Sequence, residues 1–333
     1  MAVRAWVSCV LLAAGLAHAA EQADASAGRG EVPVAPAPSP PFAAGSVVGP
    51  WAWTELGGFL GAGTFVEPRL YGLAGFWTDL SAGWGFEAGR VHLRPSARFS
   101  LGVEATLPDS VTGNRVSFTP LALSLAAANL IDEPRTGLRL TPAIGLTIPT
   151  WLDGSTPLTT ASFALQLERR FGPVEFGLRS ELGKPIYVAL QPTSAPLSFG
   201  VAQPNVNWSW ANSLQAEGWI TESLSLGLSF GWNMAWRFSA AREVDPFTPA
   251  GAPAAGSART DLMTGRIFGS WAFMKRFGLS LEMNTTQPPL SGDRSSVRFP
   301  FLSLGNWANN TTVLFLSVWF RTDATLARNW IER

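Results

Sequence analysis

The residues of this sequence that could perform acid–base, nucleophilic or metal chemistry are few and scattered. The only cysteine is Cys9, and His92 is the only histidine after the first twenty residues. No cluster of His, Cys and carboxylates has metal-ligand spacing. The glycines of GGFLGAG (residues 57–63) lack the following Lys-Ser or Lys-Thr pair of a phosphate-binding loop. The pair Asp132 and Glu133 is typical of a turn. We therefore predict no catalytic residue, no metal site and no cofactor.

Most of the other charged side chains alternate with apolar ones. In RFSLGVEATLP (residues 98–108), Arg98 and Glu104 fall on one face, and Phe99 and Val103 fall on the other. Successive side chains of a β-strand point to opposite faces, so this period of two predicts a strand with one polar and one apolar surface. The same alternation recurs in residues 138–148, 162–168, 174–182, 224–238 and 279–284.

The composition indicates what the apolar faces contact. Mean hydropathy is +0.15 and 14% of the residues are charged. Past the N-terminus the longest apolar stretch is LALSLAAANLI (residues 121–131), which is too short for a transmembrane helix. A membrane-embedded chain without such helices must close its strands into a barrel, because lipid satisfies no unpaired backbone group. We predict an all-β, closed antiparallel transmembrane β-barrel. A large soluble sandwich is the alternative.

The N-terminus predicts export. In MAVRAWVSCVLLAAGLAHAA, Arg4 precedes an apolar run and a small-x-small triplet, which is the order of a cleaved signal peptide over residues 1–19. The apolar run is short for the alternative, a membrane anchor. A disordered Pro/Ala-rich linker over residues 20–50 follows. We expect the barrel over residues 51–323 and a C-terminal periplasmic extension over residues 324–333.

The connections between the predicted strands alternate between short and long, as in outer-membrane barrels with periplasmic turns and extracellular loops. The short ones are residues 93–97, 132–136, 170–173, 221–223 and 275–276; the long ones are residues 109–115, 150–158, 184–206, 239–257 and 287–310. The strands between them are residues 83–92, 98–107, 116–130, 137–149, 159–169, 174–183, 207–220, 224–238, 258–274, 277–286 and 311–321.

Both termini of such a barrel lie in the periplasm, which requires an even number of strands. We therefore expect a twelfth strand, over residues 69–77, with counts of ten or fourteen as alternatives. The apolar phase slips at Pro120, which predicts a bulge or a later start of that strand. In residues 311–321 both faces are apolar, so the pattern does not identify the lipid side.

The tryptophans predict two belts at the lipid–water boundaries. We expect Trp151, Trp208, Trp210 and Trp236 on the long-loop side, and Trp219, Trp271 and Trp319 on the short-turn side.

If the apolar faces contact lipid, the charged residues of the polar faces line the interior. These candidates are Arg98, Glu104, Arg139, Glu168, Glu175, Arg179, Glu181, Glu217, Arg237, Arg266 and Glu282. The signs are mixed, so no strong ion preference follows. We favour a salt-bridged network that stiffens the wall over a substrate-selecting constriction, and we expect the charges to be paired or hydrated.

Four segments share one pattern, a turn followed by alternating Leu or Phe and then a polar loop: PSARFSLGVEATLP, GPVEFGLRSELGKP, TESLSLGLSFGW and KRFGLSLEMNTTQPP. This pattern resembles outer-membrane β-barrel proteins of diderm bacteria, of the porin or transport-barrel type, over about residues 57–321. No functional residue carries over from the resemblance. Such barrels end on an aromatic residue of the last strand, and here Phe320 is followed by TDATLARNWIER.

The resulting functional hypothesis is a pore for passive or weakly selective passage of small molecules through the outer membrane. The expected partners are outer-membrane lipid, the outer-membrane assembly machinery and an unidentified small solute. Nucleic acid is excluded because the net charge is zero. The alternatives are a non-conducting adhesion or assembly scaffold and, less favoured, an outer-membrane lipid hydrolase that depends on His92. We do not expect an enzyme.

Overall fold

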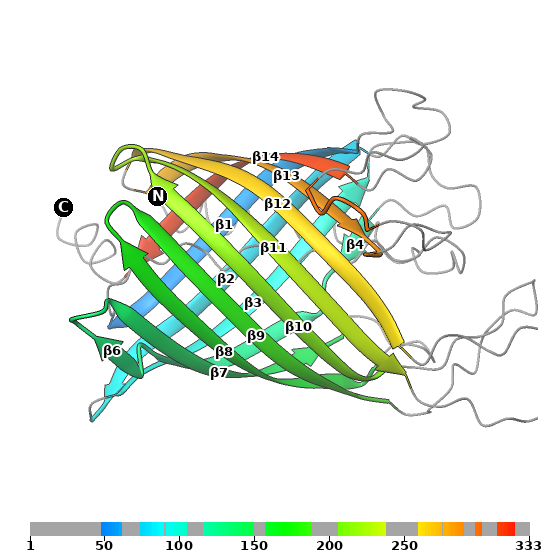
Figure 1. Cartoon of the computed structure of the whole chain (residues 1–333), viewed down its shortest axis with the longest axis horizontal. Coiled ribbons are helices and arrows are strands. Elements are labelled where there is room, and N and C mark those ends of the chain that lie inside the picture. The colour runs from blue at the N-terminus through cyan, green and yellow to red at the C-terminus, as the bar shows by residue number, and fades with distance from the viewer. Residues whose placement is uncertain are drawn as a thin grey trace, which may run out of the picture.

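The structure is a closed β-barrel (Figure 1). The computed structural model describes residues 48–61, 74–89, 91–104, 116–149, 157–187, 206–237, 259–274, 276–289, 297–301 and 312–323. The predicted signal peptide, the linker up to residue 47 and the C-terminal extension lie outside these ranges. Among the described residues, no helix is long and apolar enough to cross a membrane.

The strands follow one another along the chain with no helix between them in the described ranges. They are β1 (Gly49–Gly61), β2 (Ala74–Ala88), β3 (Val91–Glu104), β4 (Val116–Phe118), β5 (Leu121–Ala128), β6 (Ile131–Glu133), β7 (Leu138–Ile148), β8 (Thr159–Phe171), β9 (Val174–Ile186), β10 (Val206–Trp219), β11 (Leu224–Arg237), β12 (Arg259–Met274), β13 (Phe277–Gln287) and β14 (Thr312–Asp323).

Apart from β4, β5 and β6, each strand pairs antiparallel with its sequence neighbours, and β1 pairs with β14, which closes the barrel. The short strands β4 and β5 both pair with β3 and together occupy one position, whereas β6 pairs only with β7. The barrel therefore has 12 strands, as predicted. The break between β4 and β5 falls at Pro120, where the sequence predicted a slip in the strand.

The first three strands differ from the prediction. The prediction of a twelfth strand over residues 69–77 is wrong. The first strand, β1, ends at Gly61, and the second, β2, begins only at Ala74. The short turn expected at residues 93–97 is wrong, since these residues belong to β3 and the turn follows Ala88, at Gly89 (φ 66°). The sequence misled us because Pro95 looks like a turn residue, yet a proline fits a strand where its missing N–H is not needed.

The outer surface is apolar, as the alternation predicted. Leu226 and Leu228 of β11, Phe163 of β8 and Leu281 of β13 are among the exposed large side chains. Residues on the opposite face of the strands, such as Ser225 and Ser229 of β11, Gln166 of β8 and Ser270 of β12, line the interior instead. An apolar exterior with a polar interior is the arrangement of a barrel surrounded by lipid rather than by water.

The last strand, whose facing the sequence left open, is resolved by its burial pattern. Leu314, Leu316 and Val318 are exposed on the outside, whereas Ser317 and Trp319 are buried and face inward. Trp319 stacks on Trp53 of β1 with ring centroids 5.0 Å apart.

The inward position of Trp319 corrects the prediction that it belongs to the short-turn belt. Trp219 also lines the interior, with Arg170 over its ring at 4.9 Å. By contrast Trp208, Trp210 and Trp271 are exposed on the outside, as a belt requires. Trp236 lies under Arg259 and is partly exposed, and Trp151 lies outside the described residues.

Candidate channel lumen

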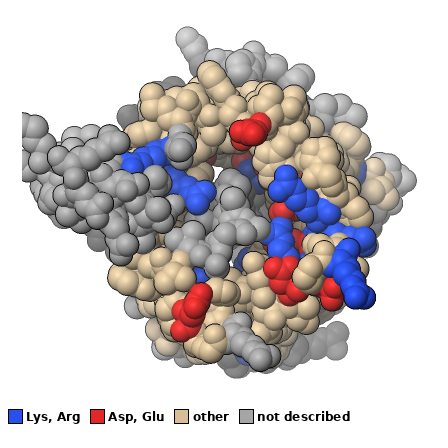
Figure 2. Space-filling view, turned by 90° about the vertical axis from the view of Figure 1, so that its left-hand side faces the viewer, with Lys and Arg blue, Asp and Glu red and all other residues tan. Residues whose placement is uncertain are grey.

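The interior of the barrel contains a cavity of about 1050 Å³. Residues of β3 and of β5 to β14 line it, together with the turn after Trp219. Figure 2 faces the end of the barrel where the short turns lie and shows it hollowed, with basic and acidic side chains gathered along part of the rim.

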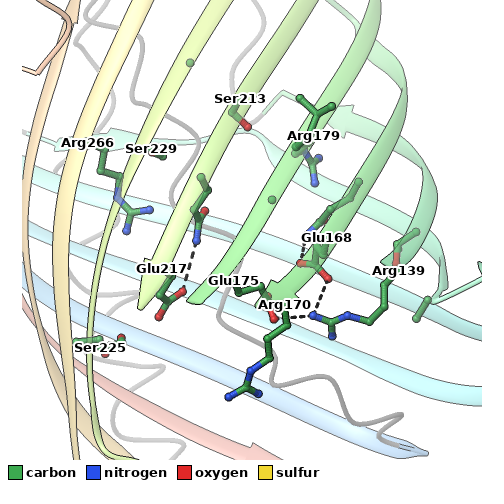
Figure 3. A pocket seen from close by; sticks show the side chains of 18 of the residues that line it. Arg139, Glu168, Arg170, Glu175, Arg179, Ser213, Glu217, Ser225, Ser229 and Arg266 are labelled. Carbon is green, nitrogen blue, oxygen red and sulfur yellow. Dashed lines mark hydrogen bonds and ion pairs between the residues drawn. The ribbon is translucent and has the colours of Figure 1, made fainter. Parts of the chain in front are cut away.

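Inward side chains of β7 to β13 form what we call the charged wall. Its best-connected residue is Arg139 of β7, whose Nη2 lies 2.6 Å from Oε2 of Glu175 and 3.6 Å from Oε2 of Glu168 (Figure 3). Arg139 pairs directly with Glu168 across the β7–β8 ladder, so strand register places the charges side by side. One guanidinium therefore holds two carboxylates from two further strands.

The next carboxylate along the charged wall is Glu217 of β10. It lies directly opposite Glu175 across the β9–β10 ladder, an arrangement of like charges that is destabilising by itself. Nε2 of Gln215 on the same strand donates to Oε2 of Glu217 at 3.5 Å. Glu217 is 9% exposed and borders the cavity. Three carboxylates, from β8, β9 and β10, thus lie on adjacent strands of the charged wall.

Two further ion pairs continue the charged wall. Nε of Arg266 on β12 lies 2.7 Å from Oε1 of Glu282 on β13, and the guanidinium lies 4.3 Å over the ring of Phe268. On β9, Nη2 of Arg179 donates to Oε2 of Glu181 at 2.6 Å. Alternate inward positions of one strand are close enough for such a bond.

The opposite side of the interior, formed by β14, β1 and β2, is what we call the aromatic wall. Besides Trp53 and Trp319 it contains Phe59, Trp77 and Phe315, with centroid distances of 6.1 Å from Phe59 to Phe315 and 6.3 Å from Trp77 to Phe315. Gly57 makes room for these rings, because a Cβ there would lie 2.8 Å from Nε1 of Trp77. Glycine at this position therefore permits the close packing of the rings.

Two acidic residues that sequence reasoning missed are buried in the aromatic wall. Asp79 of β2 accepts two bonds from Nε of Arg98 on β3, at 3.0 and 3.1 Å. Glu55 of β1 accepts a bond from the hydroxyl of Ser317 on β14. Both were missed because β1 and most of β2 were not recognised as strands, although Trp53, Glu55 and Gly57 do alternate with Thr54 and Leu56.

The remaining predicted lumen residues divide into two groups. The first group lines the cavity: Arg98, Arg139, Glu168, Glu175, Arg179, Glu181, Glu217 and Arg266. Glu282 forms an ion pair with one of these residues, Arg266. The side chains of Glu104 and Arg237 lie outside the described part of the chain. His92 lies at the short-turn end, with Nδ1 3.7 Å from Oε1 of Glu87.

Comparison with known proteins finds the fold but no close relative. No protein-family profile matches the sequence, and no curated protein matches it. Among solved structures, an outer membrane channel from Pseudomonas putida F1 is 12% identical with a TM-score of 0.56, over 85% of this chain and 99% of that one.

Two other similar structures are more distant. The outer membrane phospholipase dimer of Salmonella typhi is 11% identical with a TM-score of 0.43, over 85% of this chain and 94% of that one. OmpT, an outer membrane protein of Vibrio cholerae, is 9% identical with a TM-score of 0.38, over 82% and 96%. The closed barrel of 12 strands and its similarity to the Pseudomonas putida channel show that the chain has the fold of the outer-membrane β-barrels.

Proposed function

We propose that this protein is a channel of the bacterial outer membrane that passes small water-soluble molecules, passively or with weak selectivity. The single observation that supports this most is the cavity of about 1050 Å³ bordered by the charged wall. Ionised side chains such as Arg139 and Glu175 are costly to bury without water or partners, so a hydrated interior fits them. The membrane lipid contacts the apolar exterior, and the outer-membrane assembly machinery inserts the chain.

Barrel size is consistent with a narrow pore. Eight-stranded barrels are filled by side chains, and barrels of 16 or more strands leave a wide aqueous channel. With 12 strands, this barrel has one side occupied by aromatic rings and the other bordering the cavity. The similar Pseudomonas putida protein is described as a channel, which supports the same function here.

The test is the conductance of the refolded chain in planar lipid bilayers. We expect discrete conductance steps, and we expect Ser229→Trp, whose side chain points into the cavity, to reduce them. Leu228→Trp is the matched control, because Leu228 is on the outside, and it should leave conductance unchanged. A folded protein that conducts nothing would instead favour the non-conducting scaffold.

A further inference from the structure

A short segment of the β13–β14 connection, residues 297–301, lies against the outside of the barrel wall near the long-loop end of β12 and β13 (Figure 1). We call it the strap. It covers outward positions of three strands: Gly265 of β12, Thr285 and Gln287 of β13, and Thr312 of β14. These positions point outward because each lies on the same face of its strand as an exposed apolar residue. That residue is Ile267 on β12, Leu281 on β13 and Leu314 on β14.

The residues of β13 and β14 under the strap are polar. Thr285 is 0% exposed and Gln287 is 2% exposed, although both share the face of Leu281, which is 59% exposed. The hydroxyls of Thr285 and Thr312 lie 3.0 Å apart. Without the strap, these hydroxyl and amide groups would face the surroundings of the barrel.

The position of this polar patch along the barrel places it at membrane depth. Trp271, exposed at the short-turn end, pairs with Leu279, and Thr285 is six residues further along β13. At about 3.4 Å per residue and a tilt of about 40°, Thr285 lies roughly 15 Å above that tryptophan. The apolar band of such barrels is about 25 Å tall, so the patch falls inside it.

Hydrogen bonds between the strap and the wall satisfy polar groups on both sides. Oγ1 of Thr285 donates to the carbonyl of Phe301 at 3.1 Å, and Nε2 of Gln287 donates to the carbonyl of Phe299 at 2.5 Å. The backbone N–H of Arg298 donates to the carbonyl of Pro289 at 2.9 Å. Pro300 has no N–H to satisfy. A segment in hydrocarbon needs such internal pairing.

The close fit depends on a glycine. A Cβ at Gly265 would lie 2.1 Å from the carbonyl oxygen of Pro300, so only glycine lets the strap backbone approach β12 this closely. Above this contact the strap presents apolar groups: Val297 is 77% exposed, Phe299 is 55% exposed, and the ring of Phe299 packs at 5.8 Å from that of Phe301.

We propose that the strap is embedded in the outer leaflet of the membrane, where Val297 and Phe299 contact lipid acyl chains. The strap covers the polar patch and presents Val297 and Phe299 outward. Lipid is favoured as the occupant because the next outward residues on the flanking strands, Ile267 of β12 and Leu314 of β14, are also exposed apolar side chains. The inference rests on the proposed membrane location of the barrel.

Spin labelling tests the proposal, because the chain has only Cys9, which Cys9→Ser removes. Single labels go on Val297→Cys and Phe299→Cys in the full chain, refolded into phosphatidylcholine vesicles. Leu281→Cys is the lipid-facing reference, and Glu222→Cys, in the exposed β10–β11 turn, is the aqueous reference. Collision rates with oxygen and with a nickel chelate report on lipid and water, respectively.

We expect both strap labels to match Leu281→Cys, with an oxygen-to-nickel ratio several-fold above that of Glu222→Cys. If the strap labels match Glu222→Cys while Leu281→Cys remains in lipid, the strap is in water and the proposal is wrong. Dipolar broadening between strap labels would identify a second copy of the chain as the occupant and would also overturn it. If Leu281→Cys itself is in water, the proposed channel in the membrane fails instead.

Discussion

The charged wall and the aromatic wall divide the interior of one barrel into two regions with different physics. In the charged wall, residues such as Arg139 and Glu175 border the cavity and are held by cross-strand ion pairs. In the aromatic wall, Trp51 and Trp53 are each 7% exposed, and ring packing resembles that of a protein core. The comparison teaches that β14, β1 and β2 stabilise the barrel, whereas β7 to β13 give the cavity its chemistry.

The largest expected effect falls on the aromatic wall. Trp319→Ala removes the ring that stacks on Trp53 at 5.0 Å and should lower the free energy of unfolding by about 3–5 kcal/mol, because it leaves a cavity in a packed region. Urea unfolding in lipid vesicles measures this. Trp271→Ala is the control: Trp271 is half exposed on the outside and should cost less. An equal loss in both variants would remove the distinction between the aromatic wall and the outer surface.

The next effect tests the facing of β11, on which the charged wall depends. Phe230→Arg places a charge on the lipid side and should destabilise the barrel by about 2–4 kcal/mol near mid-membrane. Ser229→Arg points into the cavity and should cost less, because water and the carboxylates of the charged wall accept the new guanidinium. The same unfolding assay compares the two variants. Equal losses of unfolding free energy would mean that Phe230 does not point to the lipid and Ser229 does not point to the cavity.

The two walls also differ in how far the sequence predicts them. Alternation identified the inward residues of β7 to β13 because their neighbours outside are apolar and their own side chains are polar. In β14 the inward Phe315 and Trp319 are as apolar as the outward Leu316 and Val318, so hydropathy has no period to detect. Which side chains of β14 point inward is decided by ring packing against β1, a contact between the first and last strands of the barrel.

Register is the other feature that the sequence could not supply. The pattern predicted that Glu175 and Glu217 both point inward, but not that they lie directly opposite each other. Nor did it indicate that Arg139 bridges two strands. The strap was also invisible in the sequence, because Thr285 and Gln287 look like loop-entry residues until Phe299 and Phe301 are seen to bind them.

A change in selectivity should follow from unbalancing the charged wall. Arg139→Gln removes the cation that holds Glu168 and Glu175 and leaves three carboxylates, with Glu217, on adjacent strands. We expect the cation-to-anion permeability ratio to rise roughly fivefold, since one unit charge at about 4 Å in water corresponds to about 1 kcal/mol.

Reversal potentials in a KCl gradient measure this ratio. Arg135→Gln, in the exposed turn before β7, removes the same charge outside the cavity and should leave the ratio unchanged. If Arg139→Gln conducts with the ratio of the unmodified protein, then the charged wall is structural and does not act on permeating ions.

The smallest expected effect lies between the two walls, where β3 meets β5. The hydroxyls of Ser96 and Ser124 lie 2.6 Å apart across this ladder, and neither charge nor ring packing supports the contact. Ser96→Ala should lower the free energy of unfolding by about 1 kcal/mol, the net value of an ordinary hydrogen bond, and Ser96→Ala with Ser124→Ala should cost little more, because the second change removes the partner left unpaired. Additive losses in urea unfolding would show that each hydroxyl has another partner, such as lumen water, and that the hydrated region extends from the charged wall as far as β3.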